Sequence, residues 1–464
     1  MFPRGQTTVG DAPWARKLLH DARFPHVLPS PVRDIDRRIL AISIPAFAAL
    51  ISEPLMLMAD TAIIGHVGRT ELAGLAAAST VLMTVVGLCI FLAYGSTATV
   101  ARHQGAGDDR RALQSALGGV WLALGLGVIL GAGLAVFARP LGRSLASSPQ
   151  VADLAYDYLI VAAASVPALL LVLAATGALR GLLDLRTPLL AMIAANLVNV
   201  IITLLLVHGL GWGLRGAALG LVIAQWFAAV WLCLVVIRRA RAVRASVRPD
   251  LGEVLTAAAD GVPLLVRTLT LRISLIIATL VAAGLGDAPL AAHQIATTVV
   301  SFLAFALDAL AIAGQTLTGR TLGASDATGT RAMTRRMIAW GVGAGVVFGL
   351  VIAAASPLLV RGFTSDSLVQ STAIPALLVV AAIQPLSGVV FVLDGVLIGA
   401  GDGVYLAWAG ILVLALYAPA ALAVGWLDAS FMWLWVAYGV FITARLATLW
   451  WRQRGDAWMV LGSR

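Results

Sequence analysis

Two carboxylates, Glu53 and Asp60, interrupt the first strongly apolar stretch of the chain. They are seven positions apart, so a helix would carry both on one face, about 10 Å from each other along its axis. Pro54 removes a backbone donor between them and is expected to bend the helix or free a carbonyl group. An ionisable side chain costs at least about 2.5–3.5 kcal/mol in the middle of a membrane. The pair therefore predicts a proton or cation relay, the alternative being that Asp60 only caps or hydrates the end of its helix.

A polar stripe interrupts a later apolar stretch. Asn196, Asn199 and Thr203 lie at positions i, i+3 and i+7, which is one face of a helix. A buried amide needs hydrogen-bonding partners, and we expect Asp60 to supply one. The alternative is a purely structural bond between helices, worth on average about 0.6 kcal/mol.

The second half of the chain carries a separate set of polar residues in apolar surroundings. Its candidates for an ion or substrate site are Arg272, Asp308, Gln315 and Asp394. We expect Arg272 to lie near the membrane centre and to pair with Asp308 or Asp394, because a charge at that depth needs a counter-charge. Such a pair could be a neutralised structural contact or a second site, and the sequence leaves both open.

The elements that carry these residues repeat at an offset of 218 residues. Pro45 returns as Pro263 (263 − 45 = 218), and the turn sequence at 105–108 returns at 323–326. In these turns we expect glycine to supply a positive φ and aspartate to cap the next helix. A soluble repeat array would have a period of about 20–50 residues, so the long apolar repeat indicates two equivalent membrane lobes.

The carboxylates themselves are not repeated. The positions of Asp60 and Glu53 are taken in the second half by Ala278 and Leu271. Residues shared by both halves are those that the scaffold needs. Polar residues found in one half only are candidates for a function that only one lobe performs.

The composition predicts an all-α polytopic membrane protein. Of the 464 residues, 60% are hydrophobic and 12% charged, whereas soluble proteins carry roughly 25% charged residues. Apolar stretches near the ~20 residues needed to span a bilayer predict twelve transmembrane helices, six in each repeat: about 35–65, 71–101, 111–137, 150–178, 187–208, 214–237, 253–284, 289–320, 331–356, 368–398, 403–424 and 428–451. An even number per repeat gives the two lobes parallel topology, related by an axis along the membrane normal.

Arginines concentrate on one side of these predicted helices, which places both termini and the central loop in the cytoplasm. The expected organisation is a cytoplasmic N-terminal tail at 1–34, an N-lobe at 35–240, a cytoplasmic linker at 241–252, a C-lobe at 253–452 and a cytoplasmic tail at 453–464. The net charge of +9 is spread over many short loops. It therefore indicates topology and contact with anionic membrane lipids, and no nucleic-acid partner is expected.

The chain lacks the short motifs of metal, nucleotide and redox chemistry. It contains no CxxC, HExxH or GxxxxGK[ST] sequence. We therefore expect no cofactor, no metal and no catalytic residues. If the chain transports, an ion gradient must drive it, with H⁺ as the coupling ion and Na⁺ as the alternative. The expected oligomeric state is a monomer.

Five segments together resemble one known family, the multidrug and toxic compound extrusion (MATE) family, in its DinF-like branch. They are ADTAIIGH at 59–66, LRGLLD at 179–184, RGAALG at 215–220, AAHQ at 291–294 and LDGVLIGAGD at 393–402. No single segment is diagnostic, but their order within a twelve-helix chain covers nearly everything from residue 36 to 450.

This resemblance implies a V-shaped pair of six-helix lobes in the plasma membrane, the inner membrane of a bacterium. It further implies export of small cationic or amphipathic compounds in exchange for H⁺ or Na⁺. In the family the first-helix aspartate, here Asp60, takes up the coupling proton and bends its helix. Its usual partners in the fifth helix are an asparagine, matched by Asn199, and an aspartate, replaced here by Thr203. A polar position of the sixth helix falls near Leu221, and Glu53 is an additional carboxylate.

Three other functions remain open at the level of sequence. A flippase for lipid-linked sugars or another amphiphile would keep the fold and change the cargo. An intramembrane enzyme would need convergent catalytic groups, and Leu393-Asp394-Gly395 is a poor match to the GxGD type of motif. A non-transporting sensor would have little use for charges in the middle of a membrane.

Overall fold

The computed structural model describes residues 32–146, 148–427 and 429–463, and these are folded into helices joined by short turns. Twelve segments of this part of the chain are long and apolar enough to cross a membrane, which confirms the predicted all-α membrane fold. Their helices are α2 Val32–Gly65, α3 Arg69–Leu88, α4 Phe91–Gly105, α5 Asp109–Leu145, α6 Pro149–Ala162, η2 Ala163–Ser165, α7 Val166–Gly181, α8 Arg186–Leu204, η3 Leu205–Gly209, α9 Gly213–Ala242, α10 Leu251–Gly284, α11 Asp287–Gly323, α12 Ala327–Phe363, α13 Ser367–Gly399, α14 Gly403–Trp426 and α15 Met432–Arg454.

The helix boundaries reproduce the sequence repeat. Three consecutive spans of the first half begin and end 218 residues before their counterparts in the second half. These pairs are Arg69–Gly105 with Asp287–Gly323, Asp109–Leu145 with Ala327–Phe363, and Pro149–Gly181 with Ser367–Gly399. The repeat is therefore structural as well as a similarity of residues.

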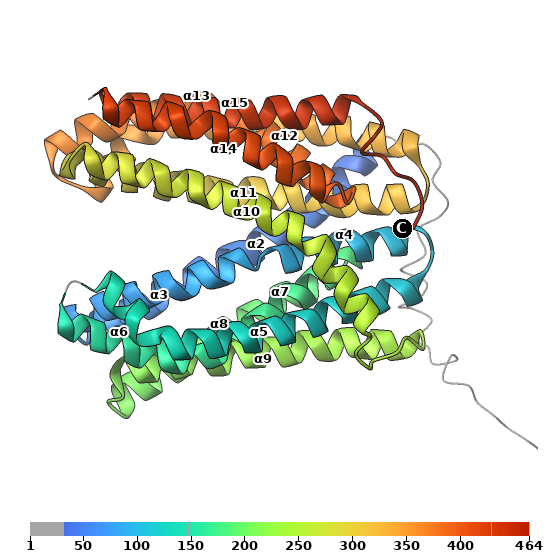
Figure 1. Cartoon of the computed structure of the whole chain (residues 1–464), viewed down its shortest axis with the longest axis horizontal. Helices are drawn as coiled ribbons and strands as arrows, with labels where there is room; N and C mark the ends of the chain where they lie inside the picture. Colours follow the sequence, from blue (N-terminus) through green and yellow to red (C-terminus); the bar gives the residue numbers. More distant parts are fainter. Residues whose placement is uncertain (1–31, 147, 428, 464) are drawn as a thin grey trace, which may run out of the picture.

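The two halves form two layers of helices (Figure 1). Helices α3–α9 make up one layer and α11–α15 the other, while α2 (blue) and α10 (yellow) run obliquely between them. The layers approach each other at the right of the view, where the C-terminus is marked, and diverge toward the left. We call the right-hand end the basic end, because it carries Arg102, Arg239, Arg320, Arg336 and Arg452.

The first half of α2 packs on the opposite lobe. At its start, Asp36 accepts hydrogen bonds at 2.6 Å from Arg336 and at 2.8 Å from the indole of Trp340, both on α12. Farther along, the ring of Phe47 lies edge-on against Phe302 of α11, with centroids 6.5 Å apart. The second half of α2 then returns to its own lobe and packs on α8.

Helix α10 does the same in the other direction, with its first half packed on the N-lobe. Its first half contacts α4 and α5 of the N-lobe, where Gly118 leaves no room for a side chain against Glu253, and its second half packs on α14. By the predicted boundaries along the chain, at 35 and 253, α2 belongs to the N-lobe and α10 to the C-lobe. The packing adds that the first half of each helix lies against the other lobe.

The repeated turns at 105–108 and 323–326 have the predicted conformation. Gly107 and its counterpart Ser325 both adopt positive φ, at 79° and 58°. Asp108 and Asp326 each cap the following helix, accepting a hydrogen bond from the backbone N–H three residues on at 2.9 and 2.8 Å. Ser325 thus tolerates a conformation for which glycine is the usual residue.

The glycines that begin these turns serve a different purpose. A Cβ atom on Gly105 would overlap the carbonyl oxygen of Arg320, and one on Gly323 would overlap that of Arg102. The ends of α4 and α11 therefore touch backbone to backbone across the lobes at the basic end. Only glycine permits this approach.

The segment 455–463, predicted as part of a cytoplasmic tail, folds back onto the basic end. We call it the strap. Its Trp458 is 2% exposed, and the Gly462 amide donates to the carbonyl of Leu322 at 2.9 Å. Arg102 of the N-lobe donates to the carbonyl groups of Gly462, at 2.8 Å, and Val460. The strap consequently joins α15 of the C-lobe to α4 of the N-lobe.

Candidate functional site

The second half of α2 carries Asp60 into the core of the N-lobe. Asp60 is 3% exposed, and Asn199 of α8 is fully buried beside it. With its amide oriented so that the nitrogen faces the carboxyl group, Asn199 donates to Asp60 Oδ1 at 2.9 Å. Its oxygen then accepts from the backbone N–H of Leu221 on α9 at 3.2 Å. The side chain at Leu221 is apolar, but its backbone still completes the network.

Two more polar side chains adjoin this carboxyl group. Thr203 lies one turn after Asn199, is fully buried, and places its hydroxyl so close to Gly220 that a Cβ atom there would overlap it. Tyr158 of α6, 3% exposed, interacts electrostatically with Asp60. Sequence reasoning missed Tyr158, because a single tyrosine in an apolar helix has no pattern that distinguishes it.

Asp60 has no cationic partner among the described residues. The ion pairs of this part of the chain involve other carboxylates, and the neighbours of Asp60 are amide, hydroxyl and apolar groups. A buried charge without a counter-charge is costly, and it is relieved by neutralisation or by a bound cation. At Asp60, a bound proton or a small cation would relieve this cost.

Glu53 lies two turns before Asp60 on α2, and Asn196 lies about one turn before Asn199 on α8. The Asn196 amide donates to the carbonyl of Ser52, two residues before Pro54, at 2.7 Å, and its own oxygen is buried without a partner. Glu53 is half-buried, and no hydrogen bond or ion pair of its carboxyl group is found among the described residues. Helix α2 remains continuous through Pro54. The structure therefore links Asn196 to the proline region of α2, and it leaves Glu53 separate from Asp60.

The C-lobe contains a buried ion-pair cluster centred on Asp394 of α13. Arg267 of α10 donates to its Oδ1 from Nε at 3.0 Å, and Arg445 of α15 donates to its Oδ2 at 3.0 Å. The predicted pairing of Arg272 with Asp308 or Asp394 is wrong. Arg272 is exposed, and its guanidinium lies against Gly87 of α3. Arg445 was missed, although a charge inside the last apolar span was a usable signal.

Asp308 instead takes part in a contact between the lobes. The hydroxyl of Tyr94, on α4, donates to both carboxylate oxygens at 3.5 Å. The backbone carbonyl of Tyr94 accepts from Gln315 of α11 at 2.5 Å, and the Arg267 guanidinium carbon lies 6.0 Å from the centre of its ring. Tyr94 thus connects the N-lobe to three of the polar side chains of the C-lobe.

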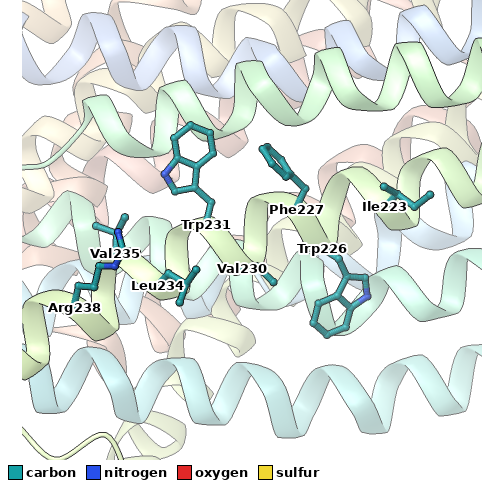
Figure 2. Close-up of a pocket in the computed structure, with 8 residues that line it drawn as sticks. All are labelled: Ile223, Trp226, Phe227, Val230, Trp231, Leu234, Val235 and Arg238. Atoms are coloured by element: carbon teal, nitrogen blue, oxygen red, sulfur yellow. The ribbon is translucent and has the colours of Figure 1, made fainter.

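A large apolar groove on the surface is separate from all of these residues. Its lining belongs to one helix, α9, between Ile223 and Arg238 (Figure 2). Trp226 and Phe227 are 37% and 41% exposed there, as expected for a helix whose outer face contacts lipid tails. We assign this groove to the lipid-facing surface.

Comparison with known proteins agrees with this architecture. The MatE family model matches residues 45–205 and again residues 263–426, and the two matches begin 218 residues apart (263 − 45 = 218). Protein DETOXIFICATION 44, chloroplastic, of Arabidopsis thaliana is 29% identical over 462 residues, covering 94% of this chain and 86% of its own. DNA damage-inducible protein F of Escherichia coli K12 is 27% identical over 442 residues, covering 91% and 94%.

Solved structures share the same fold. A point mutant of the Vibrio cholerae MATE transporter VcmN superposes with a TM-score of 0.84 at 20% identity, covering 92% of this chain and 98% of its own. A MATE structure in the bent conformation gives a TM-score of 0.83 at 20% identity, covering 92% and 96%. The chain therefore belongs to the MatE family and is a multi-pass membrane protein, a secondary transporter and not an enzyme.

Proposed function

We propose that this transporter exports organic cations or amphipathic compounds in exchange for H⁺, by alternating access of its two lobes. The observation that carries the proposal is the environment of Asp60, a carboxyl group that is 3% exposed in the N-lobe and has neutral neighbours. Proton binding removes the cost of that buried charge, and proton release restores it. The site can therefore store and return the free energy of a proton gradient.

Helix α2 supplies the mechanical connection. Its second half carries Asp60 against α8 of the N-lobe, and its first half is tied to the C-lobe through Asp36 and Arg336 at 2.6 Å. Pro54 lies between these two attachments. Bending of α2 at this proline when Asp60 is protonated would change the position of one lobe relative to the other. Substrate and proton must bind the two arrangements with different affinities, because otherwise no exchange results.

The orientation of Asn199 favours H⁺ over Na⁺ as the coupling ion. With the amide assigned so that both of its groups are satisfied, its nitrogen faces Asp60 and its oxygen accepts from the backbone N–H of Leu221. Sodium is a hard cation that needs several oxygen ligands, and this arrangement directs a donor at the position that an ion would occupy. A proton on Asp60 needs no further ligands.

The arginines of the basic end suggest the orientation in the membrane. By the positive-inside rule this end, with the central connection between α9 and α10, faces the cytoplasm. The lobes then meet on the cytoplasmic side and diverge toward the outside, which is an outward-facing arrangement (Figure 1). We propose the inner membrane of a bacterium as its location.

The test is efflux of a fluorescent organic cation from vesicles that contain the purified protein, driven by a pH gradient or a Na⁺ gradient. We expect exchange with H⁺ in the wild type and its loss in Asp60→Asn. Asp287→Asn, which changes an exposed carboxylate, is the matched control and should transport normally. Glu53→Gln shows whether the second carboxylate of α2 also contributes to transport.

Three results would contradict the proposal. Normal transport by Asp60→Asn would remove this residue from the coupling site. Flux driven by a Na⁺ gradient but not by a pH gradient would mean that Na⁺, and not H⁺, is the coupling ion. No flux of any organic cation under either gradient would instead favour a flippase for an amphiphile.

A further inference from the structure

One buried arginine of the transporter lacks a direct partner. Arg180, in the last turn of α7, is 9% exposed. Its guanidinium forms no hydrogen bond and no ion pair within 4 Å with any residue that the structure describes. Its electrostatic neighbours are Asp308 and Tyr94. A buried guanidinium without a counter-ion is costly, so this position requires an explanation.

The packing of α7 fixes Arg180 in this place. The helix lies so close to α4 that a Cβ atom on Gly177 would overlap the carbonyl oxygen of Ala93. The hydroxyl of Thr97 on α4 donates to the carbonyl of Gly177 at 3.0 Å. This backbone contact places Arg180, one turn later, beside the helix that carries Tyr94. The guanidinium is therefore positioned by rigid helices of the N-lobe.

The polar junction around Tyr94 has an excess of positive charge. It contains three guanidinium groups and two carboxylates, which gives +3 − 2 = +1: Arg180, Arg267, Arg445, Asp308 and Asp394. Asp394 already pairs with two of these arginines. Asp308 is the remaining carboxylate near Arg180, and it lies beyond ion-pair distance. One more negative charge would complete the cluster.

The same junction is accessible between the lobes. Asp308 and Tyr94 lie inside long apolar helices, yet both remain partly exposed while contacting each other across the lobes. A molecule between the lobes would meet the exposed part of this pair first, with the Arg180 guanidinium beside it. Arg180 and Tyr94 belong to the N-lobe and Asp308 to the C-lobe, so the cluster changes shape whenever the lobes move.

We propose that Arg180 binds the carboxylate of an amphipathic substrate at this junction. The planar guanidinium matches a carboxylate bidentately, and such charge-assisted hydrogen bonds are among the strongest that proteins form. The substrate carboxylate supplies the missing negative charge, beside the hydroxyl that Tyr94 donates to Asp308. The position equivalent to Arg180 in the second repeat is Ile398 (180 + 218 = 398), so the repeat does not duplicate this subsite. This inference rests on the proposed export function and specifies one chemical group of its substrate.

Two dyes that differ by one methyl ester provide the test. Rhodamine 110 carries a free carboxylate, and rhodamine 123 is its methyl ester with the same cationic ring system. Transport of each dye is measured in the same vesicles for wild type, Arg180→Gln and Arg180→Lys. Arg361→Gln is the matched control, because it removes an exposed arginine at the end of the helices that is opposite the basic end.

We expect Arg180→Gln to raise the KM for rhodamine 110 roughly ten-fold or more, the loss of one charge-assisted contact, and to leave the KM for rhodamine 123 unchanged. Arg180→Lys keeps the charge and should recover part of the difference. Equal handling of both dyes by the wild type would overturn the subsite while leaving the export function intact. An equal loss of both dyes in Arg180→Gln would also overturn it, because it would indicate a structural role such as closure onto Asp308.

A binding measurement separates this inference from the proposed transport. Fluorescence polarisation of each dye with purified protein in detergent requires no ion gradient. Tighter binding of rhodamine 110 that disappears in Arg180→Gln would support the subsite even if neither dye is transported. Equal affinities of the wild type for the two dyes would refute it.

Discussion

The glycine contact at the basic end offers a direct way to shift the balance between conformations. Gly105→Ala places a methyl group onto the carbonyl oxygen of Arg320, and Gly323→Ala places one onto that of Arg102. The obstructing atoms belong to the backbone and cannot rotate away. Overpacking of this kind costs about 1–3 kcal/mol. Because the contact exists only while the lobes touch at this end, either substitution should favour separation of the lobes there by roughly 5- to 150-fold.

The assay is a distance measurement between spin labels on the two lobes. Cysteines replace the exposed residues Arg110 of α5 and Arg335 of α12, after Cys89 and Cys233 have been exchanged for alanine. Gly95→Ala is the matched control, because Gly95 lies on the same helix α4 with no atom within 4 Å of an added Cβ. We expect a longer-distance population in both contact variants and an unchanged distribution in the control. Unchanged distances in all three variants would refute the argument that this contact holds the lobes together.

Two further predictions concern stability. Asp394→Asn leaves the guanidinium groups of Arg267 and Arg445 without their shared carboxylate, which should destabilise the protein by about 3–5 kcal/mol; Asp402→Asn, at a partly exposed ion pair of the basic end, should cost about 1 kcal/mol or less. Equal shifts in apparent Tm would contradict this ranking. Trp458→Ala empties the buried position of the strap and should cost about 3–5 kcal/mol, read as a lower apparent Tm in detergent. An unchanged Tm would mean that the strap does not stabilise the lobes.

The sequence was sufficient for the scaffold because the bilayer imposes simple rules. Long apolar stretches must become helices in lipid, since backbone groups have no other partners there. The repeat then fixed the number of helices in each half, and turn chemistry identified the caps at Asp108 and Asp326. These predictions depend on local patterns that hold independently of the final packing.

Contacts between distant helices could not be predicted from local sequence patterns in this way. The expected neighbours Asp60 and Asn199 do meet. That expectation came from the need of a buried amide for a partner, and the family resemblance related the same two positions. The expected partner for Arg272 was wrong, since several charges of similar depth compete and only packing decides which of them meet. The exchange of α2 and α10 between the lobes was missed for the same reason: an apolar helix shows no sign of which neighbour covers it.

That exchange makes the protein resemble a domain-swapped dimer that has been fused into one chain. In such dimers each subunit is completed by an element of the other, and the interface is self-complementary. Here the first halves of α2 and α10 are the exchanged elements, and the glycine contact between α4 and α11 has the same reciprocity, each glycine touching the carbonyl of the other repeat. A six-helix half expressed alone would therefore lack part of its own packing surface and expose another. Two halves cut between α9 and α10, at 243–250, should recover both surfaces by associating with each other.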